Sequence, residues 1–205
     1  MPRLFALILA AAFTSMPVFA DQANVAAQAL LQQEKIGLRS AGKAHLTSMV
    51  TPVARKSVIY NTSWLNAQKT ATGGAQWECL AEALYFEARG ETVKGQFAVA
   101  EVIMNRVESG RFPDTICGVI NQGTGRKYAC QFTYTCDGIP ERIHEPKAWA
   151  RVGKVARAII DGVAPLNLTN GATHYHTTAV RPRWSRTYTR TAKFGVHLFY
   201  RHTWS

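Results

Sequence analysis

The stretch from Trp77 to Gly95 has the spacing of a helix followed by a turn, and three glutamates lie on the predicted helix. Glu78 and Glu82 fall on the polar flank of this helix, whereas Glu87 falls between apolar residues near its end. Burial raises the pKa of a carboxyl because it penalises the charged form, and a raised pKa suits a general acid near neutral pH. Glu87 is therefore the candidate catalytic acid. The alternative is that all three glutamates are ordinary surface charges.

Histidines form a second candidate group. His174 and His176 lie two residues apart on a predicted strand and so point the same way. With His197 they could form a three-histidine metal site. The alternative is that they line a substrate cleft or satisfy the sheet. No H-E-x-x-H or similar motif accompanies them, so we predict neither a metal nor a cofactor. Trp184 is either an aromatic at the edge of a cleft or an ordinary hydrophobic anchor.

The predicted loop at residues 121–140 carries aromatic and amide side chains. Gln131, Phe132 and Tyr134 lie there between two cysteines. Aromatic faces stack on sugar rings, and amides form hydrogen bonds with hydroxyl and N-acetyl groups, so this loop suits sugar binding. The alternative is a disulfide-closed loop whose aromatic side chains simply cover the core.

Four cysteines, an even number, favour disulfides in an exported protein. Cys130 and Cys136 flank a five-residue loop and could pair locally, which would leave Cys79 with Cys117. Crossed pairings remain open, since four cysteines allow three connectivities. The spacing lacks the C-x-x-C pairs typical of structural zinc sites.

The first twenty residues have the pattern of a secretory signal peptide. Arg3 supplies the positive region, residues 4–13 the apolar region, and Val18-Phe19-Ala20 a small-residue cleavage site. Removing residues 1–20 takes away one basic residue and no acidic one, so the net charge falls from +11 to +10, from 23 basic minus 13 acidic residues. A basic exported protein is suited to anionic polymers such as peptidoglycan.

Other partners are not expected. The basic residues are scattered and no nucleic-acid-binding motif accompanies them, so we predict no nucleic-acid partner. The apolar run of the leader is short for a membrane span and no later segment is a candidate, so we predict no stable membrane insertion after cleavage. We expect a monomer.

The chain divides into three segments. Residues 1–20 form the signal peptide, residues 21–75 a poorly ordered N-terminal segment or linker with one short helical pattern, and residues 76–205 the catalytic domain. In the last segment, helical patterns come first and alternating strand patterns follow from residue 172 onward. This order predicts an α+β fold, a helical core with a small antiparallel sheet.

Several motifs in this last segment follow a recognisable order. They are L-A-E-A-L-Y-F-E-A-R-G-E, G-Q-F-A-V-A-E-V-I-M-N-R-V, F-P-D-T-I-C-G-V-I, C-Q-F-T-Y-T-C-D-G, G-A-T-H-Y-H and K-F-G-V-H-L-F-Y. Over about residues 77–202 the sequence resembles the SleB/CwlJ-type cell wall hydrolase family. The resemblance implies a fold similar to lysozyme and lytic transglycosylases, with peptidoglycan glycan strands as substrate. It places the glutamate of the family's E-A-R motif, the single catalytic acid, on Glu87.

The same resemblance implies cleavage of the bond between N-acetylmuramic acid and N-acetylglucosamine. Substrate-binding residues are expected around Glu87, namely Gln131, Phe132, Tyr134, His174, Tyr175, His176 and Trp184. A hydrolase would also need a second carboxylate, for which the candidates are Glu82, Glu91, Glu101, Asp114 and Asp137. None shows the paired arrangement of a glycosidase, although Asp137 is the most plausible helper. A lytic transglycosylase is therefore favoured.

Two other functions stay open, an N-acetylmuramoyl-L-alanine amidase that would use the histidines, and a non-catalytic peptidoglycan-binding module. The chain departs from the spore-germination members of the family by its cysteines at residues 117–136 and by the lack of a recognisable peptidoglycan-binding repeat. Together with the leader, these features predict an exported protein, periplasmic in a Gram-negative envelope or secreted.

Overall fold

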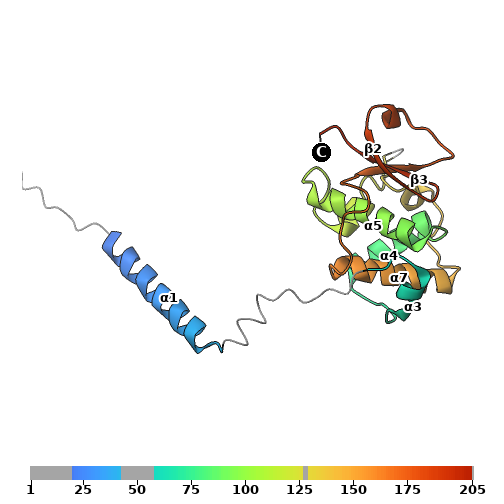
Figure 1. The fold of residues 1–205 in the computed structure, drawn as a ribbon. Coiled ribbons are helices and arrows are strands. Elements are labelled where there is room, and N and C mark those ends of the chain that lie inside the picture. The colour runs from blue at the N-terminus through green and yellow to red at the C-terminus, as the bar shows by residue number, and fades with distance from the viewer. Residues whose placement is uncertain (1–19, 43–57, 127–128, 205) are drawn as a thin grey trace, which may run out of the picture. The chain divides into compact units, whose positions relative to one another are not determined.

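The computed structural model describes residues 20–42, 58–126 and 129–204. The chain divides into two compact units, residues 1–54 and residues 55–205, which we describe separately. In the first unit, helix α1 spans Ala20–Ser40 (Figure 1) and is longer than the short helix expected there. Its side chains are exposed from Asn24 onward. The expected signal peptide lies outside the described residues except for Ala20.

The second unit is a bundle of helices beneath a small sheet. Its α-helices are α3 (Thr62–Ala67), α4 (Ala75–Ala88), α5 (Val93–Glu108), α6 (Ile116–Ile120) and α7 (Pro146–Ile160). Two 3-10 helices span Thr133–Cys136 and Arg183–Arg186. In Figure 1 the sheet lies above α5, and α4 and α7 lie below it. None of the helices in the described ranges is both long and apolar enough to span a bilayer.

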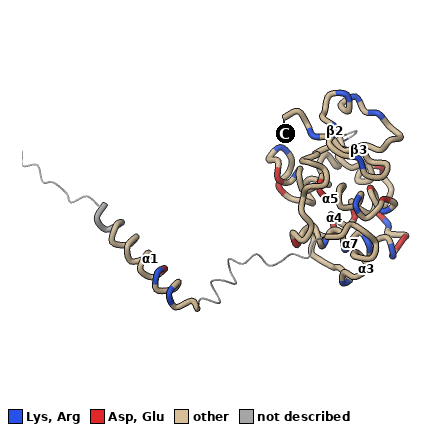
Figure 2. The backbone as a smooth tube through the Cα atoms, viewed as in Figure 1, with Lys and Arg blue, Asp and Glu red and all other residues tan. Residues whose placement is uncertain are grey.

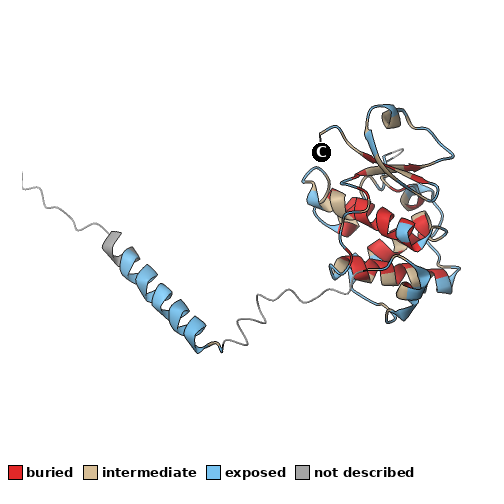
Figure 3. Ribbon diagram, viewed as in Figure 1, coloured by how far each residue is buried: buried red, intermediate tan, exposed pale blue. Residues whose placement is uncertain are grey.

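The core of this unit lies between the central helices, where the buried residues gather in Figure 3. Helix α4 packs against α5, α6 and α7. Trp77 at the start of α4 donates its indole N–H to the carbonyl oxygen of Gly153 in α7, at 2.9 Å. A Cβ atom on Gly153 would lie 3.0 Å from the Trp77 ring, so glycine allows this close approach. This contact anchors the start of α4, the helix that carries Glu87, to α7.

The sheet consists of β1 (His174–Thr177), β2 (Thr189–Phe194) and β3 (His197–Arg201), in the order β1-β3-β2. Both pairs are antiparallel, with His174 opposite Tyr200 and His176 opposite Leu198. Side chains alternate between the two faces of a strand. The inner face, toward the helices, therefore carries Tyr175, His197 and Phe199; the outer face carries His174, His176, Leu198 and Tyr200. The predicted α+β architecture is confirmed.

The compact domain begins earlier than the boundary expected at residue 76. Leu65 in α3 is completely buried, and the rings of Tyr60 and Trp64 contact Phe97 of α5 at centroid distances of 5.1 and 6.1 Å. Asn61 caps α3 by accepting a hydrogen bond from the Trp64 backbone N–H. Residues 58–75 thus belong to the core of the second unit rather than to a linker, because a few large side chains dock a polar segment onto α5.

Two disulfides join the four cysteines. Cys79–Cys117 links α4 to α6, and Cys130–Cys136 closes the loop between α6 and α7. This is the local pairing among the three connectivities that the sequence left open.

Candidate active site

Glu87 lies in the last turn of α4 and faces the inner side of the sheet. Its side chain is half-buried, and its Oε2 atom accepts a hydrogen bond of 3.0 Å from the hydroxyl of Tyr175 on β1. Burial raises the pKa of Glu87, while the Tyr175 hydrogen bond and the positive charge of Arg106 partly oppose that rise. In the described part of the chain, Oε1 has no hydrogen-bond partner. One carboxyl oxygen is therefore held while the other is free to meet a substrate.

Arg106 is the buried cation behind this carboxyl. It lies near the end of α5, is only 3% exposed, and donates from Nε to the carbonyl oxygen of Thr173 at 2.7 Å. Burial lowers its pKa to about 10, although Tyr175 and Glu87 favour its charged form. Arg106 therefore remains a cation at neutral pH and ties α5 to the start of β1. Sequence analysis did not single out Arg106; a basic residue on an otherwise apolar helix is the signal that could have found it.

The loop residues predicted to bind sugar gather on the other side of Arg106. With its amide oxygen turned toward the guanidinium, Gln131 accepts hydrogen bonds from Nη1 and Nη2 of Arg106 at 3.3 and 3.2 Å. The Phe132 ring lies 5.5 Å from the Arg106 guanidinium carbon. Arg106 thus holds the loop against α5 and the sheet. Phe132 is almost fully buried, as expected if this aromatic ring covers the core.

Tyr134 lies in the same region and stacks on Phe86 of α4, with ring centroids 4.6 Å apart. Its hydroxyl is buried and has no hydrogen-bond partner among the described residues. Burial raises the pKa of Tyr134, and the charges of Glu82, Glu87 and Glu141 raise it further. The hydroxyl is therefore a neutral, unpartnered donor within the electrostatic reach of the Glu87 carboxyl.

The other predicted cleft residues lie elsewhere. His174, His176 and Trp184 belong to the outer face of the sheet, whereas Tyr175 faces Glu87. Trp184 packs on both histidines, at centroid distances of 5.3 and 5.5 Å. The expectation that all of them surround Glu87 differs from the structure because neighbouring residues on a strand point to opposite faces. Burial lowers the pKa of His174 to about 4, so this ring is neutral at physiological pH.

The three histidines do not meet. His197 lies on the inner face, where its Nδ1 atom is 3.1 Å from Oε1 of Glu91, whereas His174 and His176 lie on the outer face. Among the described residues, no group of three or more His, Cys, Asp or Glu side chains is arranged to hold a metal ion. Strand alternation therefore separates the ligand set on which a metal-dependent amidase would rely.

Three of the candidate second carboxylates have structural partners of their own. Oε1 of Glu91 also accepts from the backbone N–H of Val196 at 3.2 Å, so this side chain clamps the β2–β3 turn. Glu101 is 1% exposed and accepts from the backbone N–H groups of Leu168 and Thr169 at 2.7 and 2.8 Å. Asp137 accepts from the N–H of Ile139 within its own loop.

The two remaining candidates differ from each other. Asp114 is exposed on the surface. Glu82 is half-buried, and burial raises its pKa, followed by the charges of Glu141 and Glu78. Glu82 lies about 140° around the helix from Glu87, since five residues separate them at about 100° per residue. Among the five candidates, Glu82 is the one whose charge, like that of Glu87, raises the pKa of Tyr134; the charge of Glu141 does so too.

These features define a class of site. A half-buried carboxyl with a raised pKa stands at the junction of a helical body and a small sheet, held by a tyrosine and backed by a buried arginine. Such an arrangement suits acid catalysis of bond cleavage by one carboxyl.

Comparison with known proteins gives the family. A model of the Cell Wall Hydrolase family matches residues 90–200, more than half of the 205 residues. The chain therefore belongs to the Cell Wall Hydrolase family. The matched residues include Arg106, Tyr134 and Tyr175; they begin three residues after Glu87.

Curated relatives carry the name spore cortex-lytic enzyme. The protein of Oceanobacillus iheyensis is 33% identical over 124 residues, covering 60% of this chain and 40% of that protein. The protein of Halalkalibacterium halodurans is 35% identical over 125 residues, covering 60% of this chain and 33% of that protein. The protein of Bacillus subtilis is 34% identical over 123 residues, covering 58% and 35%. This chain thus matches two fifths or less of the length of these three relatives.

Among solved structures, the catalytic domain of the germination-specific lytic transglycosylase SleB from Bacillus anthracis is 28% identical, with a TM-score of 0.45. The alignment covers 65% of this chain and 100% of that domain. The catalytic domain of the Bacillus cereus SleB protein gives the same identity and TM-score, covering 66% of this chain and 98% of that domain.

Proposed function

We propose that this protein cleaves the bond between N-acetylmuramic acid and N-acetylglucosamine in peptidoglycan, as a lytic transglycosylase with Glu87 as its single acid and base. The observation that carries the proposal is the state of Glu87: half-buried, with a raised pKa and one oxygen held by Tyr175. Membership of the Cell Wall Hydrolase family supports the substrate class.

In the proposed reaction Glu87 first donates a proton and then takes one back. Protonated Glu87 donates its proton to the glycosidic oxygen, the bond from the muramic C1 to that oxygen breaks, and N-acetylglucosamine leaves as an alcohol. The Glu87 carboxylate then takes the proton of the muramic 6-hydroxyl, whose oxygen attacks C1 and closes a 1,6-anhydro ring. Glu87 ends protonated, as it began, and no water is consumed.

The residues around Glu87 have matching roles in this scheme. The Tyr175 hydroxyl holds Oε2, which leaves Oε1 as the proton donor. The Arg106 charge stabilises the carboxylate that forms after the first step, because opposite charges favour the ionised form.

A hydrolase is the second candidate, and Glu82 is the observation that favours it. Glu82 is half-buried, its pKa is raised, and it acts on the same Tyr134 hydroxyl as Glu87. In that mechanism Glu82 would activate water in place of the internal 6-hydroxyl. The products would then carry reducing muramic ends.

The first experiment is mass spectrometry of the products released from purified sacculi, with the Glu87→Gln and Glu82→Gln variants compared. Both changes neutralise a half-buried carboxyl of the same helix with almost no change in shape. We expect 1,6-anhydro products from the unaltered protein and from Glu82→Gln, and a loss of about 10²–10⁴-fold in Glu87→Gln.

Other product patterns would assign other functions. Full activity in Glu87→Gln would refute the acid assignment. Reducing-end products lost in both variants would establish the hydrolase. Free stem peptides that disappear with EDTA would establish an amidase, and sacculus binding without any product would establish a binding module.

Export to the cell envelope is part of the proposal. The leader pattern at residues 1–20 and the two disulfides support it, since disulfides persist in oxidising compartments. The relatives, whose names refer to spore cortex, do not support a Gram-negative periplasm in particular. We further propose that the mature protein is a monomer without a nucleic-acid partner. Fractionation of cells and sizing of the purified protein test these points.

A further inference from the structure

The outer face of the sheet contains a hollow of about 570 Å³ that the proposed reaction does not use. Its floor is formed by β1 and β3, and its walls by the segment that crosses from β1 to β2. The polar residues that line the hollow include His176, Arg181, Ser185, Tyr188, Arg190 and Tyr200. His176 and Tyr175 are neighbours in the chain, yet one lines this hollow and the other contacts Glu87. The hollow is therefore separated from the catalytic carboxyl by the sheet itself.

The charge of this region has one sign. From Gly162 to the end of the sequence there are six basic residues and no acidic residue. In Figure 2 the charged residues of this part of the backbone are therefore all blue. The guanidinium groups of Arg181 and Arg190 are exposed, and within the described ranges neither forms an ion pair or a side-chain hydrogen bond. Two unpaired arginines at one hollow favour an anion, above all a carboxylate that guanidinium groups can bind in a bidentate manner.

The floor of the hollow is fixed by a hydrogen-bond chain. Nδ1 of His176 lies 2.8 Å from the carbonyl oxygen of Thr177, which can only accept, so Nδ1 carries the proton. Nε2 then accepts from the Tyr200 hydroxyl at 3.1 Å. The Tyr200 oxygen keeps a lone pair that can accept an amide N–H from a ligand. His176 and Tyr200 also stack, with centroids 5.1 Å apart, so this pair is rigid before any ligand binds.

One wall of the hollow is aromatic. Tyr188 stacks on Trp184 at 5.4 Å, and Trp184 in turn packs edge-on against Tyr200 at 5.3 Å. Tyr188 and Tyr200 line the hollow, and Trp184 packs between them, so the two tyrosine rings form a braced apolar wall beside the two arginines. A ligand with a carboxylate, amide groups and short aliphatic side chains would match all three features: charge, acceptor and apolar wall.

We propose that this hollow binds the stem peptide of peptidoglycan through a free carboxylate, while the glycan strand meets Glu87 on the other side of the sheet. This inference rests on the proposed function, because peptidoglycan is its substrate. The choice follows from chemistry: in the polymer the glycan backbone is uncharged, and the anionic groups are the carboxylates of the stem peptides. Arg181 and Arg190 would act on specificity, selecting strands that carry stems.

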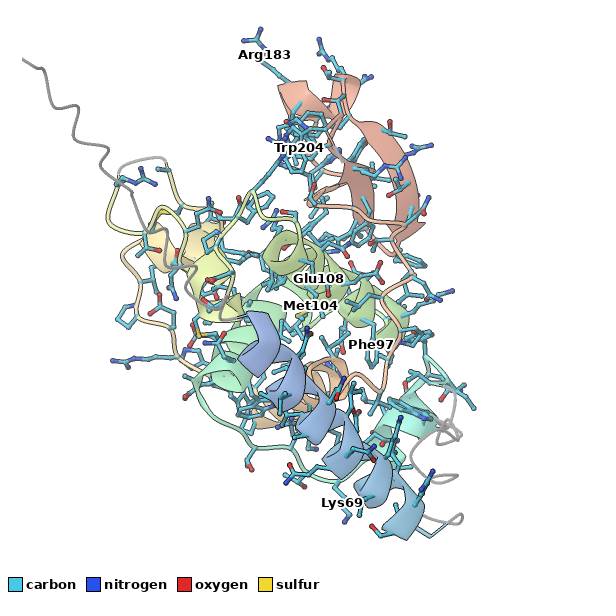
Figure 4. The ribbon with its side chains drawn as sticks, turned by 90° about the vertical axis from the view of Figure 1, so that its left-hand side faces the viewer. Lys69, Phe97, Met104, Glu108, Arg183 and Trp204 are labelled. Atoms are coloured by element: carbon cyan, nitrogen blue, oxygen red, sulfur yellow. A yellow bond between two sulfur atoms is a disulfide. The ribbon has the colours of Figure 1, made fainter. Side chains whose placement is uncertain are left out.

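The test compares binding of a disaccharide tetrapeptide with binding of the same ligand amidated at all of its carboxylates, by calorimetry on the full chain. The double variant Arg181→Gln/Arg190→Gln should bind the free-acid ligand about tenfold to a hundredfold more weakly than the unaltered protein. The matched control is Arg183→Gln/Arg186→Gln, which removes the same charge outside the hollow. In Figure 4 Arg183 points away from the helices and the sheet.

The expected result is a preference for the free-acid ligand that the first double variant loses and the control keeps. Equal weakening by both variants would overturn the proposal, because it would indicate general attraction between charges. Equal binding of the free-acid and amidated ligands by the unaltered protein would also overturn it. Thermal melts of both variants check that they are folded.

Failure of the proposed function is distinguishable by a separate assay on glycan strands stripped of stem peptides. Release of anhydro products from stripped strands depends on Glu87 and not on the hollow. Stem binding without cleavage of any strand would refute the proposed enzyme activity and leave the proposed stem-binding role of the hollow standing. Cleavage without selective stem binding would refute the proposed stem-binding role of the hollow and leave the proposed enzyme activity standing.

Discussion

The helical part of the domain and its C-terminal sheet differ in charge. All 13 acidic residues precede Gly162, and the last 44 residues carry only basic charges. The helices provide the carboxyl of Glu87, and the sheet provides the Tyr175 hydroxyl that holds it. An acid is thus placed by one region and positioned by the other. The proton donor at this junction is therefore held from the helical side by α4 and from the sheet side by Tyr175.

The two faces of the sheet repeat this contrast on a smaller scale. Tyr175 and His176 are adjacent, yet Tyr175 faces the buried acid and His176 faces a basic, open hollow. Arg106 is the link between the regions. It donates hydrogen bonds to Thr173, just before β1, and to Gln131 of the disulfide-closed loop, and its charge lowers the pKa of Glu87. Substitutions at Arg106, Gly195 and Glu87 alter the link between the two regions, their junction and the acid, with decreasing expected effect.

The largest effect is expected from Arg106→Gln. The change removes a buried cation that holds Thr173 and Gln131, and breaking a buried charged network costs about 3–5 kcal/mol of stability. It also removes a charge that lowers the pKa of Glu87, so that pKa rises further and the alkaline limb of activity moves to higher pH. Urea unfolding and a pH–rate profile measure the two effects.

The control for this change is Arg111→Gln, three residues beyond the end of α5. Arg111 is exposed and lies over the Trp204 ring, at 4.8 Å from its centroid. An exposed substitution of this kind changes stability by no more than about 0.5 kcal/mol. If the two variants unfold at the same urea concentration, Arg106 does not link the helices to the sheet.

The sequence predicts the elements better than the site. Helices and strands follow from apolar spacing, and strand alternation already separates Tyr175 from His174 and His176. What the sequence does not reveal is which face meets Glu87, because that depends on contacts such as Arg106 with Thr173, 67 residues apart. Similarly, α3 escapes pattern analysis because Leu65 and its two aromatic neighbours dock it without any repeated apolar spacing.

The loop shows the same limit. Aromatics between two cysteines predict either a sugar-binding loop or a cover for the core, and in the structure both aromatic rings of the loop, Phe132 and Tyr134, are buried against the core. Phe132 is buried against Arg106, whereas Tyr134 keeps a buried hydroxyl with no partner in the described residues. Only three-dimensional packing distinguishes neighbours of such similar chemistry.

A smaller effect is expected where the junction is clamped, at Gly195 in the β2–β3 turn. Gly195 has a φ of 54°, and a Cβ atom there would overlap the Glu91 carboxylate that binds Val196 and His197. Gly195→Ala should therefore cost about 2–3 kcal/mol, from backbone strain and from hydrogen bonds lost when Glu91 is displaced. Thermal unfolding measures this cost.

Gly110→Ala is the matched control, because Gly110 has a similar φ of 65° but open space around its Cβ position. Gly110→Ala should therefore lower the stability only by the cost of backbone strain, about 1 kcal/mol. Equal costs at the two glycines would mean that the Glu91 clamp contributes nothing to the junction.

The smallest effect is a gain of stability from Glu87→Gln, about 0.5–2 kcal/mol at neutral pH. The folded pKa of Glu87 lies above its unfolded value, so between the two the folded state binds more protons than the unfolded state. Stability of the unaltered protein therefore falls as pH rises through the folded pKa. Glutamine does not ionise, and its carbonyl oxygen can still accept from Tyr175. The gain should appear above that window and vanish below the ordinary pKa of glutamate, as measured by melting temperatures across pH. A constant difference at every pH would show that packing, and not the buried charge, distinguishes the variants; the acid would then be held at no cost to the fold, and the raised pKa of Glu87 would lose its physical basis.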